Sequence, residues 1–418
     1  MIDQEILHTV GQNLLKHDEP EVREQSALLC GSFALSGIGR QSFDYVFENL
    51  KDLLEDEDLR VREACAWAFH KVSVNEDGCR RMVANSIPEF MIMSFIQRSE
   101  PQLITYEDGQ YLIYLLNAFV NLTFSDNGIE PLLGKDAVTQ FIKILDDQSI
   151  NTILGDKYPK VAELCLRVIG NMSINQDGKD ECIENLVIAR SFVYLADLPE
   201  RSYEDALNTS LILMSCSIHL EGKNQIVDQV DDAGNPIIIQ TIISRLESLE
   251  FPDLRKNLIV ALTNVAELPR GFEEITRQLL TNIKILDEVF GARAVKPLHN
   301  FLPKLSDYDE ENLAISKDDA MRAYPVIFAL SFLFKKYKEV AADVAINETI
   351  NFAEKLAPFI NPEFQVQEEV GTCLSEVLTN DSYNCHILQK FIHKYGGLPV
   401  KNQSTLKQEM FQKFNDIF

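Results

Sequence analysis

The sequence predicts an all-α protein built as one continuous solenoid of helical repeats. A short motif that ends in glycine recurs along the 418 residues, and an apolar stripe at helical spacing precedes its clear copies. Strand signals are scarce. A chain of this length could form two or three ordinary domains, but a repeat array forms one continuous body instead.

The recurring motif places an asparagine or another polar residue seven positions before a glycine. Successive glycines of the series lie 39, 50, 50, 44 and 49 residues apart, which fits helical repeats of roughly 40 to 47 residues with loop insertions. The copies are Lys71–Gly78, Asn121–Gly128, Asn171–Gly178, Ser215–Gly222 and Asn264–Gly271, and a weaker echo ends at Gly39.

Each repeat unit is predicted to consist of helices. Val61, Ala64, Ala68 and Val72 share their offsets with residues of the next clear copy and form one apolar helix face before Gly78. We expect each glycine to supply a left-handed turn that ends this long helix. A short helix and then an apolar helix follow. The β-rich run 237–243 occupies the place of such an apolar helix, so a helix is expected there as well.

The pattern predicts five segments along the chain. Residues 1–18 form an N-terminal capping helix, 19–290 six repeats, 291–317 an acidic insertion or linker, 318–395 degenerate repeats, and 396–418 a C-terminal capping helix. A further exposed loop is expected at 97–109.

The charge balance favours particular partners. Lysine and arginine number 39 against 64 for aspartate and glutamate, giving a net charge of −25. Such a field repels phosphate backbones and anionic lipid and attracts basic protein surfaces or peptides. No run is long and apolar enough to cross a bilayer, and Met1–Glu5 lacks the pattern of a secretory signal. We therefore expect a cytoplasmic protein with no nucleic-acid or membrane partner.

No motif indicates catalysis. The chain has no glycine-rich phosphate loop and no HExxH, GxSxG or kinase signature, so no enzyme activity and no cofactor are expected. Asn75–Gly78 lacks the spacing of a calcium loop, and His386 and His393 lack further ligands, so no metal site is predicted. The eight cysteines form no CxxC pair and are expected to be buried, reduced thiols.

The long helix, the asparagine motif and the glycine together resemble the third helix of armadillo repeats, and the resemblance covers most of residues 19–390. It implies an armadillo/HEAT-type right-handed α-solenoid superhelix whose concave groove is lined by one row of these helices and binds other proteins. The residues expected in that groove row are Trp67, Lys71, Asn117, Asn121, Arg167, Asn171 and Asn264.

Two alternatives stay open for these residues. Each asparagine could instead satisfy neighbouring backbone groups, and Trp67 could be buried between repeats. Nuclear import adaptors of the armadillo superfamily place a tryptophan four residues before an asparagine, and no repeat here carries both members. An adaptor that binds basic peptides in its groove is therefore the second functional hypothesis.

The first functional hypothesis comes from two short segments around the motif glycines. Ser217–Val227 and Ala266–Gly271 resemble armadillo-type radial spoke head proteins of motile cilia, as does the short acidic N-terminus. The resemblance implies a non-catalytic structural subunit of the axonemal radial spoke, located in the cilium or flagellum and packed among other spoke subunits.

Overall fold

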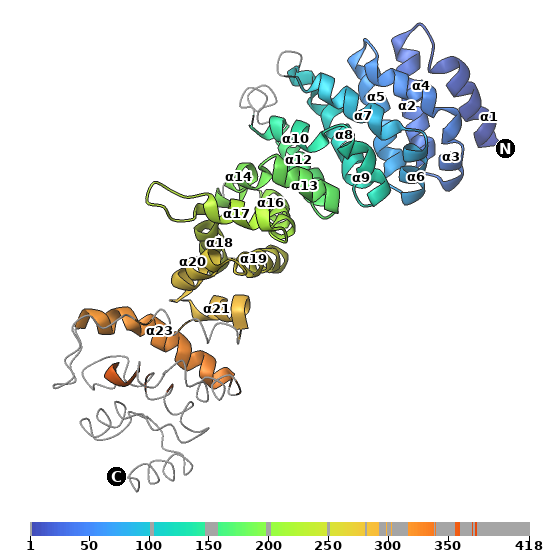
Figure 1. The fold of residues 1–418 in the computed structure, drawn as a ribbon. Coiled ribbons are helices and arrows are strands. Elements are labelled where there is room, and N and C mark those ends of the chain that lie inside the picture. The colour runs from blue at the N-terminus through green and yellow to red at the C-terminus, as the bar shows by residue number, and fades with distance from the viewer. Residues whose placement is uncertain are drawn as a thin grey trace, which may run out of the picture. The chain divides into compact units, whose positions relative to one another are not determined.

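The computed structural model describes residues 2–100, 104–146, 158–197, 202–248, 251–280, 282–291, 317–337, 356–359 and the single residues 298, 302, 339, 370 and 373. These parts are helical, and no β-strand occurs among them (Figure 1). One isolated bridge pairs Val230 with Pro236. The all-α solenoid predicted from the sequence is confirmed.

Six long helices correspond to the predicted helix before each glycine, and we call each of them the third helix of its repeat. They are α2 (Pro20–Ala34), α5 (Leu59–Ser73), α8 (Gly109–Leu122), α12 (Lys160–Met172), α16 (Tyr203–Cys216) and α19 (Pro252–Val265).

Each third helix is followed by a helix that contains the motif glycine. These are α3 (Gly37–Gln41), α6 (Glu76–Ala84), α9 (Asp126–Leu133), α13 (Gln176–Glu184), α17 (Leu220–Asp228) and α20 (Pro269–Leu279).

The apolar helices come next, and they include the β-rich run at 237–243, which is helical as predicted. They are α4 (Phe47–Asp52), α7 (Ile87–Arg98), α10 (Ala137–Asp146), α14 (Val187–Ser191) with α15 (Val193–Ala196), α18 (Ile237–Ser248) and α21 (Ile283–Phe290). The remaining helices are α1 (Ile2–Thr9) with a π-helical turn at Val10–Leu14, and α23 (Lys317–Lys336).

The chain groups into two compact units. The first unit comprises residues 1–242 and 250–265, and the second comprises 243–249 and 266–418. In the second unit, Asp287 of α21 accepts a hydrogen bond from the hydroxyl of Tyr337 at 2.9 Å and pairs with Lys336 at the end of α23. The five-segment division expected from the sequence stays a prediction, and the expected C-terminal capping helix and the acidic run 307–311 lie outside the described residues.

The motif glycines do not form left-handed turns, so that part of the sequence-based prediction is wrong. Among the described residues, only Gly234 and Gly291 are glycines with a positive φ. The motif glycines lie in the first turn of the next helix, and Gly39, Gly78, Gly128, Gly178 and Gly222 contact the preceding one closely. A Cβ on Gly78 would lie 1.9 Å from the carbonyl oxygen of Val72, and at Gly39, Gly128, Gly178 and Gly222 the corresponding distance is 2.0 to 2.2 Å. Glycine is needed because two helices approach closely there.

The residue three positions before each glycine starts the next helix. Asn75 accepts hydrogen bonds through its side chain from the backbone N–H of Asp77, and Asn175 does the same from Asp177. Ser36 plays this part for Gly39. Asparagine and serine are favoured N-caps because their oxygens satisfy backbone donors that the helix leaves free. Cap and glycine together set where one helix ends and the next begins.

The core is continuous across neighbouring repeats. Phe95 of α7 lies 5.8 Å from Phe119 of α8 and 5.2 Å from Phe141 of α10, measured between ring centroids. Seven of the cysteines lie in described regions, and all seven are buried free thiols, while Cys385 lies outside them. The burial of apolar side chains between repeats is what stabilises a solenoid whose single repeats cannot bury a core alone.

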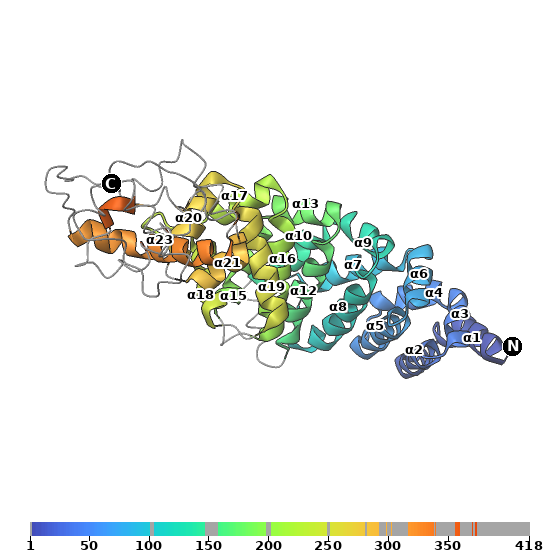
Figure 2. The same cartoon turned by 90° about the horizontal axis from the view of Figure 1, so that it is seen from below.

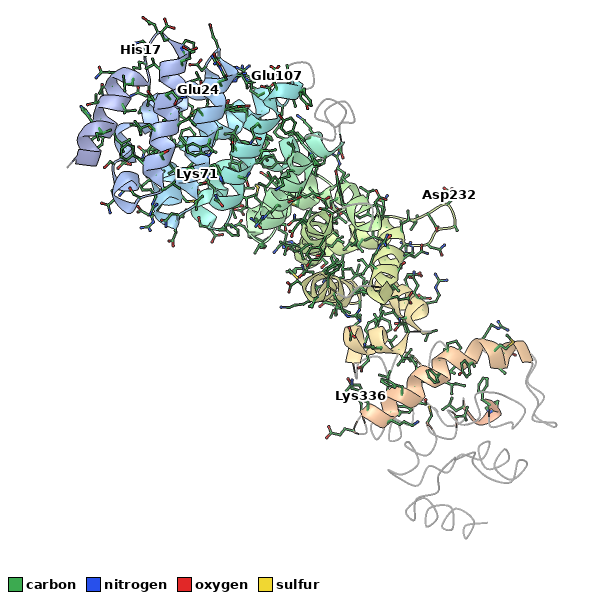
Figure 3. The ribbon with its side chains drawn as sticks, turned by 180° about the vertical axis from the view of Figure 1, so that it is seen from behind. His17, Glu24, Lys71, Glu107, Asp232 and Lys336 are labelled. Carbon is green, nitrogen blue, oxygen red and sulfur yellow. The ribbon has the colours of Figure 1, made fainter. Side chains whose placement is uncertain are left out.

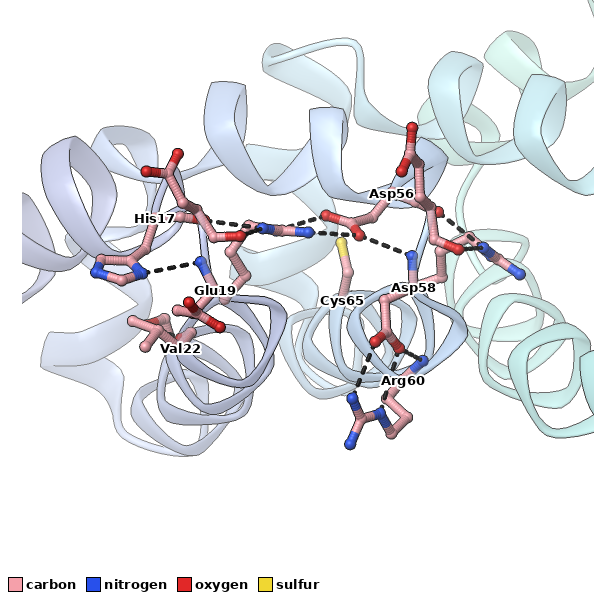
Figure 4. A network of polar contacts seen from close by, with 12 residues as sticks. His17, Glu19, Val22, Asp56, Asp58, Arg60 and Cys65 are labelled. Carbon is pink, nitrogen blue, oxygen red and sulfur yellow. Dashed lines mark hydrogen bonds and ion pairs between the residues drawn. The ribbon is translucent and has the colours of Figure 1, made fainter.

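A polar network joins the first two repeats at the start of their third helices (Figure 4). The guanidinium of Arg23 donates two hydrogen bonds to the carboxylate of Asp56, at 2.7 and 2.9 Å, and a further one to the carbonyl of His17. Arg62 donates to the carbonyl oxygen of Asp56 at 2.7 Å. A bidentate contact of this kind fixes geometry as well as adding energy, so α2 and α5 are held in one register.

The close approach at the motif glycines leads to a first prediction. Gly178→Ala should lower the free energy of unfolding by about 1–3 kcal/mol, because the new methyl group overlaps the Met172 carbonyl and the helices must move apart. Gly134→Ala is the matched control, since its Cβ would lie 3.7 Å from the closest carbonyl oxygen and its φ is −60°. Urea unfolding followed by circular dichroism measures both. Equal midpoints for the two variants would show that the close approach is not what requires glycine.

Candidate functional site

The third helices of the first unit lie side by side and form one face of that unit. Each packs on its neighbour, α2 on α5, α5 on α8, α8 on α12, α12 on α16 and α16 on α19 (Figure 2). Equivalent positions of successive repeats therefore recur along this face, which we call the third-helix face. All seven residues predicted for the groove row lie on these helices, and Arg167 is exposed while the other six are partly exposed.

Three of the four predicted asparagines tie one repeat to the preceding one. The amide nitrogen of Asn121 donates to the hydroxyl oxygen of Ser73 at 3.0 Å, that of Asn171 donates to Thr123 at 3.0 Å, and that of Asn264 donates to Ser217 at 3.0 Å. In each pair the acceptor belongs to the preceding repeat. It lies two residues after the position in that repeat that is equivalent to the asparagine. We call these contacts the asparagine ladder.

The hydroxyl groups of the ladder are also bound within their own helices. Ser73 donates to the carbonyl of His70 at 2.9 Å, Thr123 to that of Val120 at 2.9 Å, and Ser217 to that of Met214 at 2.8 Å. Each hydroxyl proton is thus committed, and the oxygen is free to accept from the asparagine. The fifth repeat carries Ser215 at the asparagine position, a side chain shorter than an amide. The ladder gives the asparagines a structural role, through side chains rather than the backbone.

Trp67 packs between repeats. Its ring fills the space above Gly31 of α2, where a Cβ would lie 2.4 Å from the ring atom Cζ3. The ammonium of Lys71 lies 5.5 Å from the ring centroid, within the range of a cation–π contact. The tryptophan is therefore held on one side by the preceding repeat and covered by Lys71, and it is not a free aromatic clamp.

The two other predicted residues differ from each other. Asn117 donates to the carbonyl of Ile113 in its own helix at 2.8 Å. Arg167 is exposed on α12 and is the one fully exposed member of the predicted row. All seven residues lie on the third-helix face, but most of their side chains bond to or pack on other residues of the same chain.

Acidic side chains lie toward the start of the third helices. Glu24, Glu63 and Glu163 occupy one equivalent position on α2, α5 and α12, and all three are partly exposed. Figure 3 shows Glu24 and Glu107 at one end of the helix row and Lys71 farther along it. Sequence analysis recognised the overall acidity of the chain but did not assign these residues to the face.

Burial and like charge raise the pKa of two of these carboxyl groups. Desolvation raises the pKa of Glu63 most, the charge of Arg62 lowers it, and the nearby Asp108 and Glu24 raise it further. For Glu163, desolvation again raises the pKa most, followed by the charge of Asp205, while Lys160 and Arg167 lower it. A cation placed beside either carboxyl group would stabilise its ionised form and would itself be attracted to the carboxylate.

A set of exposed apolar side chains was missed entirely. Five repeats carry a large apolar residue four positions before the motif glycine, and we call this set the apolar edge. Its members are Leu35, Val74, Phe124, Ile174 and Ile218. Their common offset is visible in the sequence, but at the end of an apolar helix such residues are expected to belong to the core.

The described parts show no candidate metal site. There, no three histidine, cysteine, aspartate or glutamate side chains gather in a way that could hold a metal ion. Within the same residues, no helix is long and apolar enough to span a membrane.

The asparagine ladder leads to a second prediction. Asn171→Ala should reduce the free energy of unfolding by about 1 kcal/mol more than Asn117→Ala, because only Asn171 bonds to another repeat and both changes gain the same helix propensity. Thr123→Val should cost a similar amount, and combining it with Asn171→Ala should cost little more. Urea unfolding of the four variants measures the coupling. Additive losses would mean that Asn171 and Thr123 do not act as a pair.

Comparison with known proteins finds structures of similar fold but no match in sequence. No protein-family model and no curated protein sequence matches the chain. Among solved structures, an engineered protein from the Northeast Structural Genomics Consortium matches with a TM-score of 0.56 at 16% identity, covering 100% of this chain and 98% of that one. A designed armadillo repeat protein matches with a TM-score of 0.50 at 15% identity, covering 62% of this chain and 99% of that one.

A third structure was reported for a phosphorylation switch that controls the interaction between cadherin and beta-catenin. It matches with a TM-score of 0.50 at 12% identity, over 94% of this chain and 63% of that one. These likenesses, together with the stacked third helices and their glycine turns, show that the chain has an armadillo-like fold.

Proposed function

We propose that this chain is a non-catalytic protein-binding scaffold whose third-helix face takes an extended basic segment of a partner. The observation that carries the proposal is the row of stacked third helices, which repeats the same partly exposed positions across six helices. Extended surfaces of this kind are how α-solenoids bind their partners. The net charge of −25 favours a basic ligand over the whole chain.

The local chemistry supports a mode of binding through acids. The asparagine ladder uses the amide nitrogens of Asn121, Asn171 and Asn264 to join repeats. For Glu63 and Glu163, burial and neighbouring acids raise the pKa of the carboxyl group, although Arg62 beside Glu63, and Lys160 and Arg167 beside Glu163, act in the opposite direction. Lysine or arginine side chains of the ligand would further stabilise the charged carboxylates. In this proposal carboxylates bind the ligand and asparagines keep the face in register.

The acidic positions can be tested with a labelled octalysine peptide and the full chain. Glu63→Gln combined with Glu163→Gln should weaken binding on the order of tenfold, because two favourable charge contacts in partly buried positions are removed. Glu130→Gln combined with Glu184→Gln changes the net charge equally at exposed sites outside the third helices. Fluorescence anisotropy at fixed salt compares the two pairs. If both pairs of substitutions weakened octalysine binding equally, the loss would reflect net charge alone, and this would contradict binding at the third-helix face.

Binding should also depend on pH through the same two groups. Their raised pKa means that Glu63 and Glu163 take up protons at a higher pH than ordinary glutamates, and a protonated carboxyl no longer attracts lysine. Affinity for octalysine should therefore fall as pH is lowered from about 7.5 to about 5. The double glutamine variant should show a flatter profile over this range. A wild-type affinity that rises on acidification has the wrong sign for this mechanism.

The more specific role as a structural subunit of the axonemal radial spoke stays a prediction from resemblance, and so does the location in the cilium. A pulldown from ciliated cells with the tagged full chain tests it. Spoke proteins that stay bound through a high-salt wash would support a permanent subunit, because buried interfaces resist screening. Diverse basic proteins that elute at high salt would instead support a transient adaptor.

A further inference from the structure

Among the described residues of the first unit, the apolar edge is the most exposed set of large apolar side chains. Exposure is 63% for Leu35, 61% for Val74, 69% for Phe124, 62% for Ile174 and 57% for Ile218. Of the other large apolar residues described in that unit, Leu220 alone, two positions after Ile218, is comparably exposed at 64%. Single exposed apolar residues are ordinary, but the same position exposed in five successive repeats forms a surface.

Contacts between neighbouring turns bring the members of the edge into line. Asn121 of one repeat bonds to Ser73, the residue just before Val74. Asn175, the residue after Ile174, donates to the carboxylate of Asp126 at 2.7 Å. His219, the residue after Ile218, lies 3.2 Å from the amide of Gln176. The turns are thus tied side by side, and the apolar side chains they carry follow one another at the spacing of the third helices.

Acidic residues border the edge. The helices that follow Val74, Phe124, Ile174 and Ile218 each carry acid in the first turn, and α13 and α17 also carry the buried lysines Lys179 and Lys223 there. These acids are Glu76, Asp77, Asp126, Asp177 and Glu221. Acids are stable at a helix N-terminus because they face the positive end of the helix dipole, and here they give the apolar edge a negative border.

We propose that the apolar edge docks an amphipathic basic helix of a partner protein. Packed helices lie about 8–10 Å apart, so successive apolar side chains of the edge follow one another about every 10 Å. Seven residues of an α-helix rise about 10.5 Å. A partner helix that lies along the edge and has one apolar residue per heptad can therefore place each of them against one side chain of the edge. Basic side chains beside that stripe would pair with the acidic border. A second copy of this chain is disfavoured as the occupant, since its charge of −25 repels its own kind.

This inference rests on the protein-binding role proposed above, but it concerns a surface other than the glutamates of the third-helix face. The probe is a fluorescent 28-residue alanine-based peptide with leucine at every seventh position and lysines on both sides of the leucine stripe. A peptide of the same composition with its leucines scattered around the helix is the control. A third peptide of equal charge, carrying prolines that prevent helix formation, represents an extended ligand.

The variant is Phe124→Ser combined with Ile174→Ser in the full chain. Both side chains are exposed, so the fold should persist, and circular dichroism checks this. We expect the amphipathic peptide to bind the variant at least tenfold more weakly than the wild type, with octalysine binding unchanged. Met321→Ser, at a residue that is 72% exposed outside the edge, should leave both affinities as they are.

Each other outcome has a defined meaning. Equal binding of the amphipathic and scattered peptides, or equal binding to wild type and variant, overturns the docking of a helix on this edge. Tighter binding of the proline peptide overturns the helical conformation of the partner. A dimer of the wild type that the variant loses, seen by sedimentation, makes a second copy the occupant and also overturns the proposal. If octalysine fails to bind while the edge-dependent helix binds, the third-helix role fails and this inference stands.

Discussion

The close approach of two helices at Gly39, Gly78, Gly128, Gly178 and Gly222 is the constraint on which the rest of this structure depends. A side chain at Gly78, Gly128 or Gly178 would overlap a main-chain carbonyl oxygen of the preceding helix. This contact fixes how far each third helix runs before the chain turns. Positions counted back from these five glycines therefore recur in the same place: the N-cap position of the next helix at three, an exposed apolar residue at four, and at seven the position of the ladder asparagines Asn121 and Asn171. Surface features then repeat because the turn repeats.

The asparagine ladder changes what the face can offer to a partner. An amide that donates across 48 residues to Thr123 holds two repeats together, and that donor is no longer available to a ligand. Trp67 is likewise engaged within the chain, because its ring packs against Gly31 and the ammonium of Lys71 lies over it. In the two binding modes proposed above, the partner instead contacts the partly buried glutamates through basic side chains and the exposed apolar edge through apolar ones.

Much of the fold could be predicted from the sequence, because glycine spacing and apolar periodicity are local patterns. The helix at 237–243 was predicted correctly against its β-rich composition, since its place in the repeat outweighed residue propensity. The reason for the glycines was not predictable, because it depends on a carbonyl oxygen brought close in space. The acceptors of Asn121 and Asn171 lie one repeat away, and the exposure of Phe124 depends on how the turn projects from the helix. These features arise from packing between repeats, which a pattern within one repeat does not specify.

Photocross-linking in cells tests most directly whether a partner occupies this part of the molecule. A benzoylphenylalanine is placed in turn at Phe124, on the apolar edge, and at Phe90, which is also exposed but lies on α7. The account predicts that position 124 cross-links to another protein through a basic helical segment, whereas position 90 does not. Cross-links to a partner at position 90 with none at position 124 would contradict it, and would place the binding surface away from the third helices.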